Sequence, residues 1–303
     1  MKPSRMLLVI ATMTLVSLSV SSQQAIASTG FSWLRIGAGA RAVALGNAVV
    51  SNVSDPSATY WNPGAMAFVP GTNLELTHNE SFQAVRYEFA GLTHQRGRST
   101  YGAAFHGIWT DDLQGMDEFG NQTPDFSYAG LSLSGNYAIA WTDRIGFGLG
   151  LEYLREVIST EQATAAALSF GVQAREVLPR TDFGLSVLHL GSAAKFVEEE
   201  FDLPTTVQGG LTHSIPASAL DGAFSISAEV RSERDADTQI VFGTEYRYQD
   251  FTAIQVGYRT QHDSQDVSFG LGVGTERLHG QYAYVPFGEN LGDQHRFSVQ
   301  IGL

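Results

Sequence analysis

Apolar and polar residues alternate in nearly every segment of the chain from about Ala129 to the last residue, Leu303. In residues 127–141 one face of the predicted strand carries Ala129, Leu131, Leu133, Tyr137, Ile139 and Trp141, and the other carries small or polar residues. Successive side chains of a β-strand point to opposite faces of a sheet, so each such segment predicts a strand with one apolar face. Many segments of this kind predict an all-β fold: a transmembrane antiparallel β-barrel with lipid outside and a polar lumen inside.

Turn residues divide residues 73–303 into about 14 strands, an even number as in bacterial outer-membrane barrels. We expect them at residues 73–80, 84–95, 100–109, 127–141, 145–157, 164–176, 181–190, 205–214, 222–232, 238–249, 251–260, 266–274, 277–285 and 294–303. The connections alternate between tight turns and longer loops, of which 110–126, 191–204 and 286–293 are the long ones. Tight turns of such barrels face the periplasm, so we expect both termini on the periplasmic side.

The first residues have the features of a secretory signal peptide. Lys2 and Arg5 precede an apolar run at residues 6–20, and small residues at Ala25 and Ala27 offer a cleavage site. A membrane-anchoring helix is the alternative, but the run is shorter than the ~20 residues that a span needs. We therefore divide the chain into a signal peptide (1–27), an N-terminal hatch (28–70) and a barrel (71–303) in the outer membrane of a diderm bacterium.

Composition excludes several other classes of protein. The chain has no cysteine, so thiolate metal sites and cysteine nucleophiles are impossible, and its net charge of −13 disfavours nucleic acid as a partner. The eight histidines show no metal-ligand spacing, and no nucleophile-elbow motif is present. We expect no catalytic residue, no metal, no cofactor and no enzymatic activity. A soluble β-sandwich remains an alternative fold, but it gives no reason for long and short connections to alternate.

Alternation also predicts which charged residues point into the lumen. The predicted lumen charges are Glu88, Glu152, Arg175, Glu229, Arg231, Glu245, Arg247, Arg259 and Arg296. They indicate either a polar channel or a lumen filled by paired charges, and a barrel of ~14 strands is wide enough to need a filler.

The filler is predicted in residues 31–69, which lack alternation and are rich in glycine and alanine. The segments IGAGARAVALGNA (36–48) and DPSATYWNPGAM (55–66) resemble the opening signature of the PorV/PorQ outer-membrane proteins, which are relatives of the FadL fatty-acid transporters. The segments YVPFG (284–288), LG (291–292) and HR (295–296) resemble the last hairpin of that family. The resemblance covers the whole mature chain and implies a barrel of ~14 strands with an N-terminal hatch inside. One departure is Gly64-Ala65, where relatives more often have Ala-Gly.

The hatch residues each have a physical rationale. Glycines let the backbone pass close to the wall, and Arg41 is expected to pair with one inward carboxylate, Glu88, Glu152, Glu229 or Glu245. Asp55 and Pro56 predict the start of a short helix that Pro63 ends, leaving Asn62 free to bond the loop backbone. An alternative is that all of these residues are structural and contact no ligand. The hatch motif comprises Gly37, Gly39, Arg41, Leu45, Gly46, Asp55, Pro56, Trp61, Asn62 and Pro63.

Two functions follow from the resemblance. The first is an accessory of protein secretion of the type IX kind, in which the barrel shuttles or anchors exported proteins at its acidic outer loops. The second is a FadL-like transporter that passes hydrophobic small molecules across the outer membrane. The sequence does not separate a shuttle from an anchor, and it names neither the partner nor the solute. Outer-membrane lipid is an expected partner in both cases.

Overall fold

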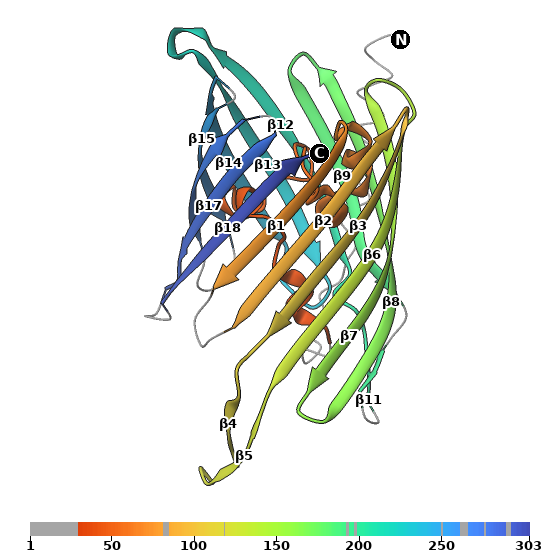
Figure 1. Ribbon diagram of the computed structural model, residues 1–303, viewed down its shortest axis with the longest axis vertical. Coiled ribbons are helices and arrows are strands. Elements are labelled where there is room, and N and C mark those ends of the chain that lie inside the picture. The colour runs from red at the N-terminus through yellow and green to blue at the C-terminus, as the bar shows by residue number, and fades with distance from the viewer. Residues whose placement is uncertain are drawn as a thin grey trace.

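Fourteen antiparallel strands close into one barrel in the computed structural model (Figure 1). The structure describes residues 30–303 except 81–84, 118, 192–193, 197–198, 250, 261–265, 276 and 289–291. The predicted signal peptide therefore lies outside the described residues. Within the described ranges, no helix combines the length and hydropathy needed to cross a bilayer.

The wall is built from strands that pair with their sequence neighbours, and β1 pairs with β18 to close the ring. Its strands are β1 (Thr72–Glu80), β2 (Arg86–Arg96), β3 (Ser99–Trp109), β6 (Tyr128–Ala140), β7 (Ile145–Ile158), β8 (Glu161–Leu178), β9 (Thr181–Gly191), β12 (Thr206–Ala217), β13 (Gly222–Glu233), β14 (Gln239–Tyr248), β15 (Thr252–Arg259), β16 (Val267–Gly274), β17 (Leu278–Pro286) and β18 (Asp293–Gly302). Each predicted strand corresponds to one of these, so the predicted fold class is confirmed.

Two of the long connections contain strands that the sequence did not predict. β4 (Leu113–Met116) pairs with β5 (Gln122–Phe126), and this hairpin projects beyond the end of the barrel (Figure 1). A second pair, β10 (Ala194–Phe196) and β11 (Glu199–Phe201), lies in the connection between β9 and β12. All five residues of β5 are exposed, so β5 has no buried face to produce an alternation of apolar and polar residues.

The hatch runs through the lumen from one end of the barrel to the other. Its elements are η2 (Ser32–Arg35), α2 (Ala40–Ala44), α3 (Ala58–Trp61) and η3 (Pro63–Phe68); a further turn, η5 (Ser218–Leu220), joins β12 to β13. Phe31 N donates to Glu156 Oε2 near the end with the long connections, which we call the long-loop end. Gln95 Nε2 donates to Ala67 O near the opposite, tight-turn end. Helices of the hatch are visible inside the ring of strands in Figure 1.

The two ends of the described chain do not lie at the same end of the barrel. Leu303 N donates to Thr72 O, so β18 ends beside the start of β1 at the tight-turn end, as an even strand count requires. Phe31 lies at the long-loop end instead. The start and the end of the barrel wall thus lie at one end of the barrel, and the first described hatch residues lie at the other. The expectation of two periplasmic termini stays a prediction, because the residues before 30 lie outside the described residues.

We predict that the long-loop end faces the cell exterior, because long loops of outer-membrane barrels are extracellular. Gln114 lies on the projecting hairpin, and Thr142 lies in the tight turn between β6 and β7; both are exposed. In intact cells, a membrane-impermeant maleimide should label the Gln114→Cys variant and leave the Thr142→Cys variant unlabelled. Both variants should react after the cells are lysed. Labelling of Thr142→Cys in intact cells would contradict this orientation.

Candidate functional site

The hatch packs against the wall where the wall has glycine in place of a side chain. A Cβ added to Gly148 on β7 would lie 2.1 Å from the carbonyl carbon of Pro63, well inside van der Waals contact. A Cβ on Gly257 of β15 would lie 2.0 Å from Gly46 N, and Gly46 itself has a φ of +65°, a conformation that favours glycine. The hatch backbone is thus seated in notches in the wall, and larger residues there would displace it.

A buried ion pair joins the hatch to the charged side of the lumen. Arg41 Nε donates to Glu245 Oε2 at 2.8 Å, and Arg41 Nη2 donates to Glu245 Oε1 at 3.2 Å. Arg247 Nη2 donates to the same carboxylate at 2.8 Å. Among the four carboxylates that the sequence left open for Arg41, the structure therefore selects Glu245. The side chains of Arg41 and Glu245 are only 11% and 4% exposed, so this pair is shielded from solvent.

A second ion pair holds the middle of the hatch. Arg231 Nη2 donates to Glu229 Oε1 at 3.0 Å, and the guanidinium carbon lies 5.0 Å from the centre of the Trp61 ring. Glu229 Oε2 accepts a hydrogen bond from Val50 N at 3.0 Å, while Trp61 Nε1 donates to Ala38 O at 2.8 Å. Charges of the wall are therefore satisfied by backbone and aromatic groups of the hatch as well as by each other.

The Asp55-Pro56 pair lies just before helix α3, which begins at Ala58 and not at Pro56. The N-cap residue of α3 is Ser57, so the prediction that Asp55 is the N-cap is wrong. Asp55 Oδ1 instead accepts a hydrogen bond from Ser57 N at 3.0 Å, two residues onward, in the turn before the helix. Glu75 Oε2 on β1 accepts from the same N–H at 3.2 Å. The sequence reading missed Glu75 as an inward residue, although it lies at an alternating polar position of its strand.

Asn62 and Pro63 join two hatch elements and the wall. Asn62 Oδ1 accepts from Gly64 N at 3.0 Å, and Pro63 opens η3 directly after α3 ends. Asn62 Nδ2 donates to Val50 O at 2.7 Å and to Val172 O on β8 at 3.1 Å. The fully buried amide thus bonds loop backbone, as its position before a proline predicted, and it also bonds a strand of the barrel.

Arg296 on β18 binds the first part of the hatch motif. Its Nη1 donates to Gly37 O, and its guanidinium carbon lies 5.2 Å from the centre of the Tyr87 ring. A Cβ on Gly37 would lie 2.4 Å from the Trp61 ring, so the glycine permits close packing. The remaining residues of the motif lie in the hatch interior: Gly39 precedes α2 with a φ of +80°, and Leu45 and Pro56 are buried.

The other predicted lumen charges lie in different surroundings. Glu152 on β7 is buried, where its Oε2 lies 3.1 Å from His189 Nδ1 and its Oε1 accepts from Ser169 Oγ at 2.7 Å. Arg259 is buried on β15. Arg175 stacks on Phe68 at 5.2 Å and lines a polar cavity of about 360 Å³ between the hatch and the wall at the tight-turn end.

Glu88 was expected in the lumen, and that expectation is wrong. It lies on the outer face near the long-loop end, where His78 Nδ1 is 2.6 Å from its Oε1. Its neighbours Tyr87 and Phe89 point inward and are 0% and 1% exposed. The sequence reading assumed that polar residues face a polar lumen, but here the hatch gives the lumen an apolar filling.

An apolar cluster fills the lumen between the hatch and the β2–β9 side of the wall. We call it the apolar lumen cluster, and its central residues are Phe31, Leu34, Tyr87, Phe89, Ile108, Leu154 and Leu203. Phe201 of β11 packs on it from the long-loop end, its ring centre 5.9 Å from that of Phe31. Sequence reasoning missed the inward part of this cluster, because apolar residues of barrel strands normally face lipid.

The described part of the chain shows no group of three histidine, aspartate or glutamate side chains arranged to hold a metal ion. The projecting hairpin is ordered by Asp117, whose Oδ1 accepts from the backbone N–H groups of Phe119 and Asn121 at 2.9 and 2.8 Å. Hydrogen bonds from Asn121 lower the pKa of the Asp117 carboxyl group. The turn presents the Phe119 side chain to solvent, 80% exposed.

Comparisons with known proteins agree with this architecture. The model of an uncharacterised protein family, UPF0164, matches residues 5–174, and the comparison with curated proteins found no match. The toluene transporter TbuX of Ralstonia pickettii superposes with a TM-score of 0.63 at 13% identity, covering 88% of this chain and 97% of that one. The toluene transporter TodX of P. putida gives 0.63 at 13% identity over 88% and 96%. A Pseudomonas aeruginosa FadL homologue gives 0.57 at 11% identity over 86% and 97%.

Proposed function

The chain belongs to the uncharacterised protein family UPF0164, and we propose that it transports hydrophobic small molecules across the outer membrane without catalysing a reaction. Its barrel is of the FadL outer-membrane type. The observation that carries the proposal is the apolar lumen cluster, which a channel for water-soluble solutes would have no reason to contain. The solved toluene transporters with the same fold support this solute class.

A secretion role of the PorV/PorQ kind is the second candidate. The residues of the hatch motif suggest it, and the projecting β4–β5 hairpin with its exposed Phe119 offers a surface for an exported protein. We place it second because the buried Arg41–Glu245 ion pair joins the hatch to the wall inside the lumen, while the inward-facing aromatic residues have no role in binding a protein at the cell surface.

The test is uptake of toluene by cells or vesicles that contain the protein. The Phe89→Gln variant places an amide in the apolar lumen cluster and should reduce the rate of toluene entry by about tenfold, the equivalent of one aromatic contact. The matched control is Phe269→Gln, because Phe269 faces outward on β16 and is 46% exposed. The control should leave the rate unchanged.

Equal rates for the wild type and Phe89→Gln, with folded protein in both membranes, would rule out the proposed path. If toluene entry does not depend on the protein at all, and an exported protein co-purifies with it but not with a Phe119→Ser variant, the secretion role replaces the transport role. Folding of each variant is checked by the shift in electrophoretic mobility that an intact barrel shows before heating.

A further inference from the structure

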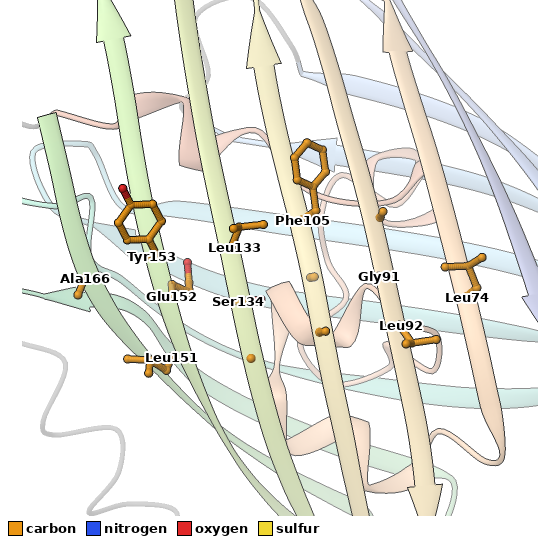
Figure 2. Close-up of a pocket in the computed structure, with 14 residues that line it drawn as sticks. Leu74, Gly91, Leu92, Phe105, Leu133, Ser134, Leu151, Glu152, Tyr153 and Ala166 are labelled. Carbon is orange, nitrogen blue, oxygen red and sulfur yellow. The ribbon is translucent and has the colours of Figure 1, made fainter. Parts of the chain in front are cut away.

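An open groove of about 580 Å³ crosses the outer face of the wall over six neighbouring strands, β1, β2, β3, β6, β7 and β8 (Figure 2). Its floor is formed by Ala103 on β3 and Gly135 on β6, which are partners in the antiparallel register. A Cβ on Gly135 would have no atom within 4 Å, so the space above this glycine is open. The groove lies outside the lumen and has no part in the hatch contacts described above.

Bulky side chains border this floor on three sides. Leu92 on β2 is paired with Ala103, and Leu151 on β7 is paired with Gly135, so a leucine stands at each end of the small pair. Two residues along each strand toward the long-loop end, Phe105 and Leu133 form the next cross-strand pair on the same face. Figure 2 shows these labelled side chains projecting from neighbouring strands around the low region.

The groove lies in the middle of the apolar belt. Ala103 is well inside β3 (Ser99–Trp109), away from both of its ends. Polar contacts mark the belt's two margins: Ser99 Oγ is 3.0 Å from the Tyr137 hydroxyl toward the tight-turn end, and His78 pairs with Glu88 toward the long-loop end. At this depth the surrounding medium is hydrocarbon, and lipid headgroups lie beyond both margins.

We propose that the groove binds one acyl chain of an outer-membrane lipid. The groove is continuous with the lipid-facing surface of the barrel, where exposed leucine, valine, isoleucine and phenylalanine side chains surround it. A second barrel would approach with a convex wall, which cannot enter a concave strip two small residues wide, whereas a single chain of methylene groups can. The proposal does not depend on which solute the lumen carries.

The preference for the groove comes from packing, because lipid chains are as apolar as the leucines and hydrophobic transfer gives no net gain. A chain in the groove touches side chains on its flanks as well as the floor, whereas a chain on the convex wall touches one surface. About ten additional carbon–carbon contacts correspond to about a tenfold preference over the rest of the wall.

The experiment uses the full-length protein in vesicles of phosphatidylethanolamine that carries a photoreactive diazirine in the middle of one acyl chain. After illumination, mass spectrometry should find adducts on the groove peptides about tenfold more often than on lipid-facing peptides of β15–β17. Gly135→Leu fills the groove and should reduce the groove adducts to the level of β15–β17. The matched control is Gly280→Leu, an outward glycine of β17 with only Val273 O near an added Cβ, at 3.8 Å.

Uniform labelling around the barrel, or unchanged groove adducts in Gly135→Leu, would overturn the proposal. A protein that forms dimers in vesicles, and loses them with Gly135→Leu but not with Gly280→Leu, would show that the groove holds a second copy instead. Gly135→Ala serves as a milder variant if the leucine prevents folding, and it should give an intermediate loss of adducts. Uptake of toluene should remain the same in Gly135→Ala, which separates this proposal from the transport function.

Discussion

Planar bilayers that contain the Gly148→Leu variant are expected to conduct ions, whereas bilayers with the wild-type protein are expected to show little current. The leucine would have to occupy the space of the Pro63 backbone, which lies 2.1 Å from the position of an added Cβ. Backbone cannot move aside as the tip of a flexible side chain can, so the α3–η3 part of the hatch must leave its notch. A lumen enclosed by fourteen strands is wide enough to hold water once it is not filled.

The control for this experiment is Gly280→Leu, which makes the same change on the outer face of the wall. Bilayers that contain this control should show as little ion current as those with the wild-type protein. Both variants should keep the electrophoretic mobility of an intact barrel. If leucine prevents assembly, Gly148→Ala introduces a smaller side chain at the same position. A folded Gly148→Leu protein without current would contradict the conclusion that the notch holds the hatch in place.

The Glu245→Gln variant is expected to be destabilised by about 3–5 kcal/mol, because it leaves Arg41 buried without its carboxylate partner. The measurement is denaturant unfolding of the protein from vesicles, followed by tryptophan fluorescence. Glu88→Gln is the matched control. The Glu88 carboxylate contacts His78 on the outer face, where the side chains of His78 and Glu88 are 50% and 32% exposed, so loss of this contact should cost at most about 1 kcal/mol.

A double variant, Arg41→Gln with Glu245→Gln, should be more stable than Glu245→Gln alone, because the unpaired charge of Arg41 is also removed. Equal destabilisation by Glu245→Gln and Glu88→Gln would mean that the Arg41–Glu245 pair does not anchor the hatch. Such a result would leave the glycine notches as the main support of the hatch position.

Alternation predicted the wall because the two faces of each strand meet two very different media. A register shift of one residue would turn every lipid-facing side chain toward the lumen and every lumen-facing side chain toward lipid. The same logic failed at Glu88, where Tyr87 and Phe89 face an apolar part of the hatch and not water. The sequence carries no local sign of this exception, since it depends on which hatch residues lie opposite β2. In a barrel with a filled lumen, the residues of the hatch as well as those of the wall decide which side chains of a strand face inward.

The hatch was predictable as a segment but not in its contacts. Glycine and proline positions indicated close backbone packing, and Asn62 before Pro63 indicated a side chain that bonds backbone. The choice of Glu245 for Arg41 could not be read from the chain, because four candidate carboxylates were equivalent until the strands were placed around the lumen. Long-range partners of this kind are a property of the closed ring.

The path of the hatch through the ring sets the order in which the protein must assemble. Residues 30–70 span the lumen from end to end, and the ring is closed by the pairing of β1 with β18, which are far apart in sequence. Pairing between such distant strands forms late, because a very long loop must close first. A ring that closed ahead of the hatch would have to admit the segment lengthwise through a finished opening. The chain instead gains most by wrapping its strands around a hatch already in place, with the β1–β18 seam as the final step.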